Sequence, residues 1–434
     1  MNIKSVNLYV TTLLLFVLSC KKETETSPTN SKPQITISSI RPTNGPYNTL
    51  DTIVGTNFSN QDSVWIDGVM AQVISISQDT IIVKVPKITG NGAITITGGG
   101  TTVTGPNFNY VFTATVSTLA GNGTYGFADG KGSSAEFMLP TSIVLDAQGN
   151  LFVAETQGHR IRKVTPDGVV STFAGNGIGG WLDGPAMKAK FYYPYGIVFD
   201  AAGNLYVGDT DNGLIRQITP AGIVNTLSGD GQGFVSQPTV TASFTSPLGL
   251  AIDSRGLLYV ADANMVKSIT SSGIVDTVAG TDLQGYVDGL IAVAEFKAPA
   301  GLAFDGTGNL YIADTYNSVI RKFVSTGQVS TFAGNGIGGF LDSTSANAEF
   351  LQPQAVVADS EGNIYVGDYA NARVRKISKN GIVSTVAGTG KHGYIDGTTD
   401  KAEFYSPWGL AIDLKGNIYV ADSRNSAIRK ISFE

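Results

Sequence analysis

The sequence has few of the side chains from which catalytic and metal sites are usually built. Its 434 residues include one cysteine, Cys20, and two histidines, His159 and His392. A single cysteine excludes an intramolecular disulfide and a zinc site made of several thiolates. This scarcity limits the catalytic options more firmly than any motif does. We therefore expect a protein that is not an enzyme and has no catalytic residues.

Charged residues and helical patterns are also scarce. Only 15% of the residues are charged, and the formal net charge is −6. Binding to phosphates needs a surplus of lysine and arginine on one face, so we expect no nucleic-acid partner. No long stretch has the apolar period of a helix, whereas short apolar runs alternate with turns rich in the 53 glycines. This pattern favours an all-β protein.

The amino terminus has the features of an export signal that ends at the cysteine. Lys4 precedes an apolar run over residues 8–18, which is shorter than the roughly 20 residues of a membrane-spanning helix. The sequence Val17-Leu18-Ser19-Cys20 resembles the lipobox of bacterial lipoproteins. That resemblance implies cleavage before Cys20 and acylation of this residue. An ordinary signal peptide with an incidental cysteine is the alternative.

The residues around the cysteine predict the location of the protein. We expect a lipoprotein signal peptide over residues 1–19 and a flexible tether over residues 20–32, which are rich in Ser, Thr, Pro and Asn. The charged residues 21–25 resemble the signal that sends some Gram-negative lipoproteins to the outer leaflet. The prediction is a protein anchored by lipid in the outer membrane, facing the cell exterior, with no other membrane contact.

Residues 33–112 alternate apolar and polar positions in short runs separated by turn residues. About seven strands in such a length are typical of an immunoglobulin-like sandwich. The segments Ile40-Arg41-Pro42, Ile53 to Phe58 and Val64 to Gly68 make this region resemble an IPT/TIG domain. The resemblance implies a spacer or interaction module, and nothing in the segment carries chemistry.

From residue 113 to 434 the chain repeats one unit six times. Each unit contains four short strands, and the units start 51 or 54 residues apart, at Val116, Val170, Val224, Val275, Val329 and Val383. Such a repeat predicts a six-bladed β-propeller. The last unit ends after its third strand. We therefore expect Val116 to Leu119 to supply the missing fourth strand and to close the ring.

The best-marked part of the unit runs from Asp305-Gly306-Thr307-Gly308-Asn309 through Asp314 to Lys322, with equivalents at residues 359–376 and 413–430. These segments resemble NHL repeats. The resemblance specifies the fold better than the function, because NHL propellers include RNA binders, protein-interaction modules, extracellular sensors and one lyase. The lyase relatives rely on a histidine-rich metal centre, which two histidines do not rebuild.

The two faces of the predicted ring differ in their loops. Tight Asp-x-x-Gly-Asn turns lie on one face, and the opposite face carries the long loops between blades, where recognition usually sits. One aromatic position in these loops recurs in every unit, which favours packing: Phe127, Trp181, Phe234, Tyr286, Phe340 and Tyr394. A second position, just after a repeated proline, varies freely: Thr141, Tyr195, Leu248, Ala300, Gln354 and Trp408.

We expect the aromatic residues near the mouth of the central channel to contact a ligand by ring stacking. The candidate residues are Trp181, Tyr192, Tyr193, Tyr195, Tyr405 and Trp408. Ordinary packing at the rim of the channel is the alternative for all of them.

Several motifs look chemical but fit turns better. The Gly-x-Gly-x-x-Gly segments at residues 121–126 and 175–180 do not open a helix, as a dinucleotide site requires. Carboxylates end the first and second strands of the units, which favours side chains that cap turn amides. The loop aspartates Asp129, Asp183, Asp288 and Asp396 leave calcium open as a cofactor, although EF-hand spacing is absent.

The combined prediction is a non-catalytic binding protein of the cell surface. Its partner is an extracellular glycan or protein, and the chain is monomeric or part of a surface complex. We favour glycan recognition for a polysaccharide-uptake system, by analogy with lipidated IPT/TIG proteins. Two alternatives stay open: a protein–protein interaction scaffold, and a calcium-dependent hydrolase or lyase in the propeller channel.

Overall fold

The computed structural model describes residues 34–86, 91–111, 114–230 and 244–433. Cys20, the signal segment, the tether and Phe234 lie outside the described residues. The chain divides into two compact units, Met1–Tyr110 and Val111–Glu434. Within the described residues no helix has the length and apolar character that a membrane crossing requires.

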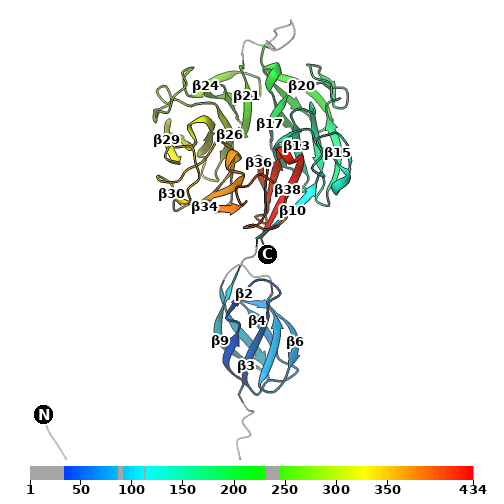
Figure 1. Cartoon of the computed structure of the whole chain (residues 1–434), viewed down its shortest axis with the longest axis vertical. Helices are drawn as coiled ribbons and strands as arrows, with labels where there is room; N and C mark the ends of the chain where they lie inside the picture. Colours follow the sequence, from blue (N-terminus) through cyan, green and yellow to red (C-terminus); the bar gives the residue numbers. More distant parts are fainter. Residues whose placement is uncertain (1–33, 87–90, 112–113, 231–243, 434) are drawn as a thin grey trace, which may run out of the picture. The chain divides into compact units, whose positions relative to one another are not determined.

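The first unit is a sandwich of two sheets (Figure 1). One sheet has the order β1 (Thr36–Arg41), β3 (Leu50–Thr56), β7 (Thr80–Lys84) and β6 (Gln72–Ile76). The other has the order β2 (Asn44–Gly45), β9 (Thr101–Tyr110), β8 (Gly92–Gly98), β4 (Ser63–Ile66) and β5 (Val69–Met70). Alternate residues of β7 and β8 are buried, and these inward side chains form the core together with Ile53 and Phe108. The period-2 pattern of the sequence therefore corresponds to an inner and an outer face of each sheet.

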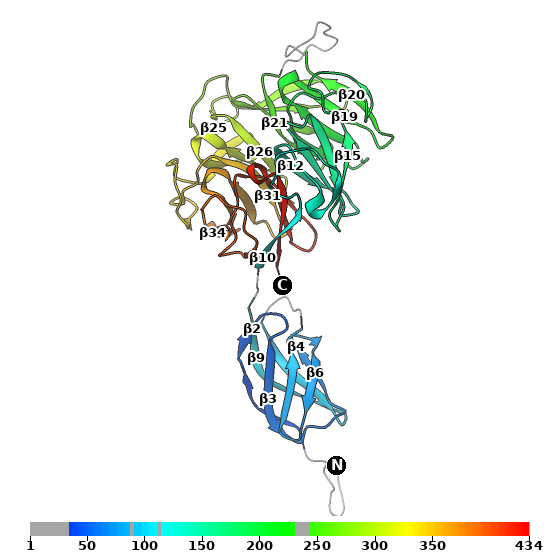
Figure 2. The same cartoon turned by 45° about the vertical axis from the view of Figure 1, so that its right-hand side comes forward.

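The second unit is a ring of six antiparallel sheets, which we number blades 1 to 6 (Figures 1 and 2). The strands that line the central channel are β12 (Pro140–Leu145), β17 (Pro194–Phe199), β21 (Pro247–Ile252), β26 (Pro299–Phe304), β31 (Pro353–Ala358) and β36 (Pro407–Ile412). The second strands are β13 (Leu151–Glu155), β18 (Leu205–Asp209), β22 (Leu258–Asp262), β27 (Leu310–Asp314), β32 (Ile364–Asp368) and β37 (Ile418–Asp422). The third strands are β14 (Arg160–Val164), β19 (Leu214–Ile218), β23 (Met265–Ile269), β28 (Val319–Val324), β33 (Arg373–Ile377) and β38 (Ala427–Phe433).

Shorter elements complete the blades. The fourth strands are β15 (Val169–Ala174), β20 (Ile223–Ser228), β24 (Val275–Ala279), β29 (Gln328–Ala333), β34 (Ile382–Ala387) and, in blade 6, β10 (Ala114–Ala120). Two-residue strands lie outside them: β11 (Gly130–Lys131), β16 (Gly184–Pro185), β25 (Gly289–Leu290), β30 (Ser343–Thr344) and β35 (Gly397–Thr398). The 3-10 turns are η1 (Gly132–Ser134), η2 (Thr210–Asn212), η3 (Thr315–Asn317), η4 (Tyr369–Asn371) and η5 (Ser423–Asn425).

The ring is closed by a strand from the start of the repeat region. β10 pairs with β38, so that Val116 faces Ile431 and Ser117 faces Lys430. This pairing places the first and last strands of the repeats in one blade and leaves no open edge between them. The predicted all-β fold, a sandwich followed by a six-bladed propeller closed by an early strand, is confirmed.

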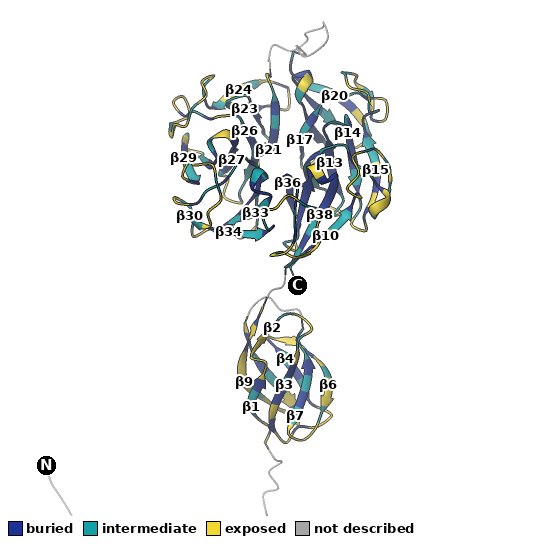
Figure 3. Ribbon diagram, viewed as in Figure 1, coloured by how far each residue is buried: buried dark blue, intermediate teal, exposed yellow. Residues whose placement is uncertain are grey.

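The burial of the strands explains the pattern of apolar residues in each unit. Every residue of the six second strands is buried, because these strands lie inside the blades with a neighbouring blade on each face (Figure 3). Their sequences are accordingly near-continuous apolar runs that end in a carboxylate. The core is divided among the seams between blades, and Phe137, Phe191, Phe296, Phe350 and Phe404 are fully buried there.

The turns after the inner strands are held by the repeated aspartate, as the sequence predicts. Asp305 Oδ1 accepts hydrogen bonds from the backbone N–H of Thr307 and of Asn309, both at 2.9 Å. Its Oδ2 accepts one from Asn309 Nδ2 at 2.8 Å. Burial by itself raises the pKa of Asp305, but these hydrogen bonds outweigh it and lower the pKa to about 2. The carboxylates of this face therefore serve the turns.

Candidate functional site

A buried ion pair recurs in the blades and accounts for the second set of carboxylates. Arg321 Nη1 donates to Asp314 Oδ2 at 2.7 Å, and Arg321 Nη2 donates to Asp288 Oδ1 at 2.7 Å. The same guanidinium donates to the carbonyls of Glu295 and Val287. Blades 1, 2, 5 and 6 repeat this arrangement, with the fully buried arginines Arg162, Arg216, Arg375 and Arg429.

These ion pairs involve the loop aspartates that the sequence left as candidate calcium ligands. Asp129, Asp183, Asp288 and Asp396 each place a carboxylate oxygen 2.5 to 2.7 Å from a buried guanidinium. In the part of the chain that the structure describes, no group of three or more His, Cys, Asp or Glu side chains is arranged to hold a metal ion. The role of these loop aspartates is to fix the loop to its blade.

In blades 1, 4, 5 and 6 the aromatic residue that recurs in the long loop covers the buried arginine. The Tyr286 ring centroid lies 5.3 Å from the Arg321 guanidinium carbon, and the Phe340 centroid lies 4.8 Å from that of Arg375. Such contacts are cation–π interactions that pin the loop to the blade. Trp181 belongs to this set and donates from Nε1 to Thr226 Oγ1 at 3.0 Å, on the fourth strand of blade 2. It makes no aromatic contact with the other candidate residues among those described.

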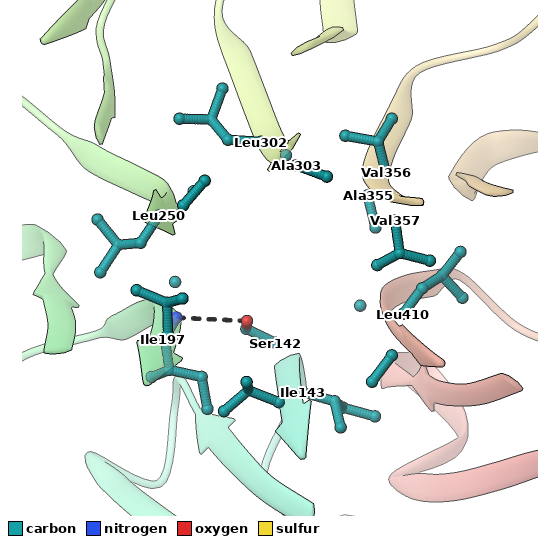
Figure 4. A pocket seen from close by; sticks show the side chains of 18 of the residues that line it. Ser142, Ile143, Ile197, Leu250, Leu302, Ala303, Ala355, Val356, Val357 and Leu410 are labelled. Atoms are coloured by element: carbon teal, nitrogen blue, oxygen red, sulfur yellow. Dashed lines mark hydrogen bonds between the residues drawn. The ribbon is translucent and has the colours of Figure 1, made fainter. Parts of the chain in front are cut away.

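The central channel is an apolar cavity of about 390 Å³ between the inner strands (Figure 4). Each blade contributes a branched aliphatic side chain from the same position of its inner strand: Ile143, Ile197, Leu250, Leu302, Val356 and Leu410. Among the described residues that line it, none is Asp, Glu, His, Lys or Arg. These described lining residues therefore supply no carboxylate or imidazole for acid–base chemistry or for holding a metal ion.

Tyr195 crosses the channel at the end nearest the long loops. Its hydroxyl, on β17 of blade 2, donates to Gln354 Oε1 on β31 of blade 5 at 3.1 Å. The same hydroxyl accepts a hydrogen bond from Trp408 Nε1 on β36 of blade 6. The Tyr195 and Trp408 rings meet edge to face with centroids 5.7 Å apart. Burial raises the pKa of Tyr195 well above its usual value, so the phenol stays protonated and holds this bridge.

Tyr369 extends this group outward and departs from the repeat. In four blades the residue after the second-strand carboxylate is a threonine or serine whose hydroxyl donates to the proline carbonyl of the next blade: Thr156 to Pro194, Thr210 to Pro247, Thr315 to Pro353 and Ser423 to Pro140. Blade 5 has Tyr369 at this position. Its ring lies edge to face with Trp408 at 4.9 Å instead. One bond between blades is thus replaced by an aromatic contact at the channel end.

Arg424 and Tyr405 complete the group. Arg424 Nη1 donates to the Tyr405 hydroxyl at 3.5 Å, and its guanidinium carbon lies 5.4 Å from the Tyr405 ring centroid. Hydrogen bonds to the hydroxyls of Tyr369 and Tyr405 raise the pKa of Arg424 further above its ordinary value. His392 stacks on Tyr405 with centroids 4.7 Å apart. We call Tyr195, Gln354, Tyr369, Tyr405, Trp408 and Arg424 the mouth cluster.

The structure therefore brings some of the predicted site residues together and separates others. Tyr195, Tyr405 and Trp408 belong to the mouth cluster. Tyr192 and Tyr193 form a second group with His159, whose Nδ1 accepts a hydrogen bond from the Tyr193 N–H at 3.2 Å. Sequence reasoning missed Tyr369 and Arg424. Comparison of the six units at the position of Tyr369, where the others have Thr, Ser or Ala, would have found the first of them.

Comparison with family models identifies the modules of the chain. Residues 35–113 match the IPT/TIG domain, and residues 350–377 and 404–431 match the NHL repeat. Residues 231–291 match the teneurin NHL domain. The chain thus combines an IPT/TIG domain with a propeller of NHL repeats.

Individual relatives share only parts of their length with this chain. Protein SUPPRESSOR OF QUENCHING 1 from Arabidopsis thaliana is 31% identical over 276 residues, which are 58% of this chain and 26% of that protein. NHL repeat-containing protein 2 from Bos taurus is 27% identical over 340 residues, which are 68% of this chain and 47% of that protein. The chain therefore spans less than half the length of either relative.

Among solved structures, an auxiliary nutrient binding protein from Bacteroides ovatus is similar over almost its whole length. The TM-score is 0.64 at 20% sequence identity, and the match covers 94% of this chain and 100% of that one. At this identity the similarity establishes the shared fold.

Proposed function

We propose that this chain is a non-catalytic binding protein of the cell surface, and that its mouth cluster captures a glycan for a polysaccharide-uptake system. The observation that carries the proposal is the mouth cluster itself. Three of its aromatic rings, those of Tyr195, Tyr369 and Trp408, stand at positions that most of the blades fill with non-aromatic side chains. Packing symmetry therefore does not dictate them, whereas sugar rings bind well on the faces of aromatic side chains.

The other parts of the chain fit this proposal. Acylation at Cys20 anchors the protein in the outer membrane, facing the exterior, and the IPT/TIG domain is a spacer between the tether and the propeller. The similar fold of an auxiliary nutrient binding protein supports a binding role. The channel wall has no carboxylate among its described residues, so the calcium-dependent hydrolase or lyase receives no support from it.

A specific observation favours a protein partner as the second candidate. On the outer edge of blade 4, Leu290, Ile291 and Val293 are 60%, 39% and 56% exposed. The equivalent positions of blade 6 are the polar residues Thr398, Thr399 and Lys401. Exposed apolar side chains that the repeat does not require are a feature of protein-binding surfaces.

Glycan capture is tested by titrating residues 33–434 against a panel of polysaccharides, with and without calcium. We expect binding that survives chelation and weakens about tenfold in Trp408→Ala, since an aromatic contact is worth about 1 kcal/mol or slightly more. Trp181→Ala is the matched control, because it removes an indole outside the mouth cluster, and it should leave the affinity unchanged. Absence of binding to every glycan would favour a protein partner, and turnover abolished by a chelator would favour the enzyme.

A further inference from the structure

We propose that Arg424 makes the mouth cluster selective for saccharides that carry a carboxylate, that is, for uronic-acid units. This inference rests on the proposed glycan-binding function and specifies the class of its ligand. It follows from how Arg424 is held, from what it does not bind, and from the side chains beside it.

The backbone of Arg424 makes a hydrogen bond that recurs at the equivalent position of other blades, and we call this recurring backbone arrangement the frame. The Arg424 N–H donates to the Tyr405 carbonyl at 3.1 Å. The equivalent N–H groups of Asp211, Tyr316 and Ala370 donate to the corresponding carbonyls in blades 2, 4 and 5, also at 3.1 Å. The frame is therefore the same for an acidic, an aromatic, a small and a basic side chain. Nothing in the fold requires an arginine at residue 424.

The Arg424 side chain is also free of the structural role that other arginines have. The five fully buried arginines each pair with two carboxylates. Arg424 is exposed, and no carboxylate of the described residues lies within ion-pair distance of it. A guanidinium carries five N–H donors, and the hydroxyls of Tyr369 and Tyr405 use two of them. Donors remain for a ligand.

The two tyrosines hold the guanidinium at the edge of the stacking surface. Tyr405 lies beneath it, and Tyr369 contacts both Arg424 and the Trp408 ring. A sugar ring packed on Tyr369 or Trp408 therefore lies next to the guanidinium. Because the fork is planar and already oriented, it can take a carboxylate through two parallel hydrogen bonds with little loss of side-chain entropy.

The charge of the whole chain strengthens this reading. The formal net charge of −6 repels anions at long range, so a cation beside the aromatic rings provides local attraction for an anionic ligand there. The equivalent residue of blade 2 is Asp211, which is exposed and has the opposite charge. Asp211 thus provides a matched control at the same place in the frame.

The experiment measures the affinity of residues 33–434 for trigalacturonate and for its fully methyl-esterified form by calorimetry. The wild-type chain is expected to bind the acid about tenfold more tightly than the ester, as one charge-assisted hydrogen-bonded pair provides. Arg424→Gln should reduce this ratio to about one by lowering the affinity for the acid. Asp211→Asn should preserve the ratio, and thermal unfolding of both variants should match that of the wild type.

Several outcomes would overturn the inference. Equal wild-type affinities for acid and ester would show that Arg424 does not bind the carboxylate of the ligand. The same would follow if the ratio of the two affinities persisted in Arg424→Gln. Tighter binding of a sulfated trisaccharide than of trigalacturonate would assign the site to sulfate. In each case glycan binding itself would stand. Failure of the wild-type chain to bind any glycan of the panel would instead remove the proposed function.

Discussion

Replacement of Arg321 by methionine is expected to lower the free energy of unfolding of the propeller by about 3 to 5 kcal/mol. Arg321 is fully buried and donates to Asp314, Asp288 and two carbonyls. Without it, Asp314 is a buried carboxylate whose remaining partners, Asn317 Nδ2 and the Lys297 N–H, are neutral donors. An uncompensated charge in this environment costs far more than the lost packing of one side chain. Chemical denaturation of the propeller measures the change.

Two further variants separate the ion pair from simple loss of volume. In blade 3 the carboxylate of Asp262 pairs with Lys267 at 2.6 Å, so a lysine is able to neutralise this position. Arg321→Lys should therefore recover part of the stability that Arg321→Met loses. Lys322→Met, at the adjacent half-buried residue, should change stability by less than about 1 kcal/mol. A loss below about 1 kcal/mol for Arg321→Met would show that the pair does not hold the blade.

Removal of β10 is expected to prevent cooperative folding of the propeller. The strand pairs with β38 from Ala114 to Ala120 and buries Val116 and Ala120 in two different seams. A chain of residues 121–434 leaves the edge of β38 open and breaks the ring between the first and last blades. The expected loss, on the order of several kcal/mol, is comparable with the whole stability of a typical domain.

Residues 112–434 are the control for this truncation. That chain keeps β10 and lacks the IPT/TIG domain and the residues before it, so it should unfold in one sharp thermal transition. Calorimetry of the two chains side by side makes the comparison. If residues 121–434 unfold as cooperatively and at the same temperature as residues 112–434, closure by β10 contributes little to the fold.

The fold could be predicted from the sequence because each unit repeats the same local signals. Second strands such as Leu310–Asp314 are apolar throughout, and their turns carry the same aspartate and asparagine in unit after unit. Six copies of a weak pattern amount to a strong one. The missing strand after Ile428 to Phe433 then required a partner from the start of the repeats, and Val116 is found there.

The candidate site could be predicted only in part, because its contacts join residues far apart in the chain. Tyr195 and Gln354 are 159 residues apart, and no periodic signal indicates that they meet across the channel. The buried ion pairs have a clearer signal in the sequence. Asp314 and Arg321 are seven residues apart, and five blades repeat an acid and an arginine at this spacing. The prediction that the second-strand carboxylates only cap turns is therefore wrong, because Asp314 also pairs with Arg321.

If the mouth cluster binds a glycan, its aromatic side chains contribute to affinity while the propeller folds equally well without them. Tyr369→Thr separates the two roles, since it restores the residue that Thr210 and Thr315 provide in blades 2 and 4. The new hydroxyl is expected to donate to the Pro407 carbonyl, so the melting temperature should stay the same or rise. Glycan affinity should fall about tenfold. Unchanged affinity, or a parallel loss of affinity and melting temperature, would show that Tyr369 serves packing and not glycan binding.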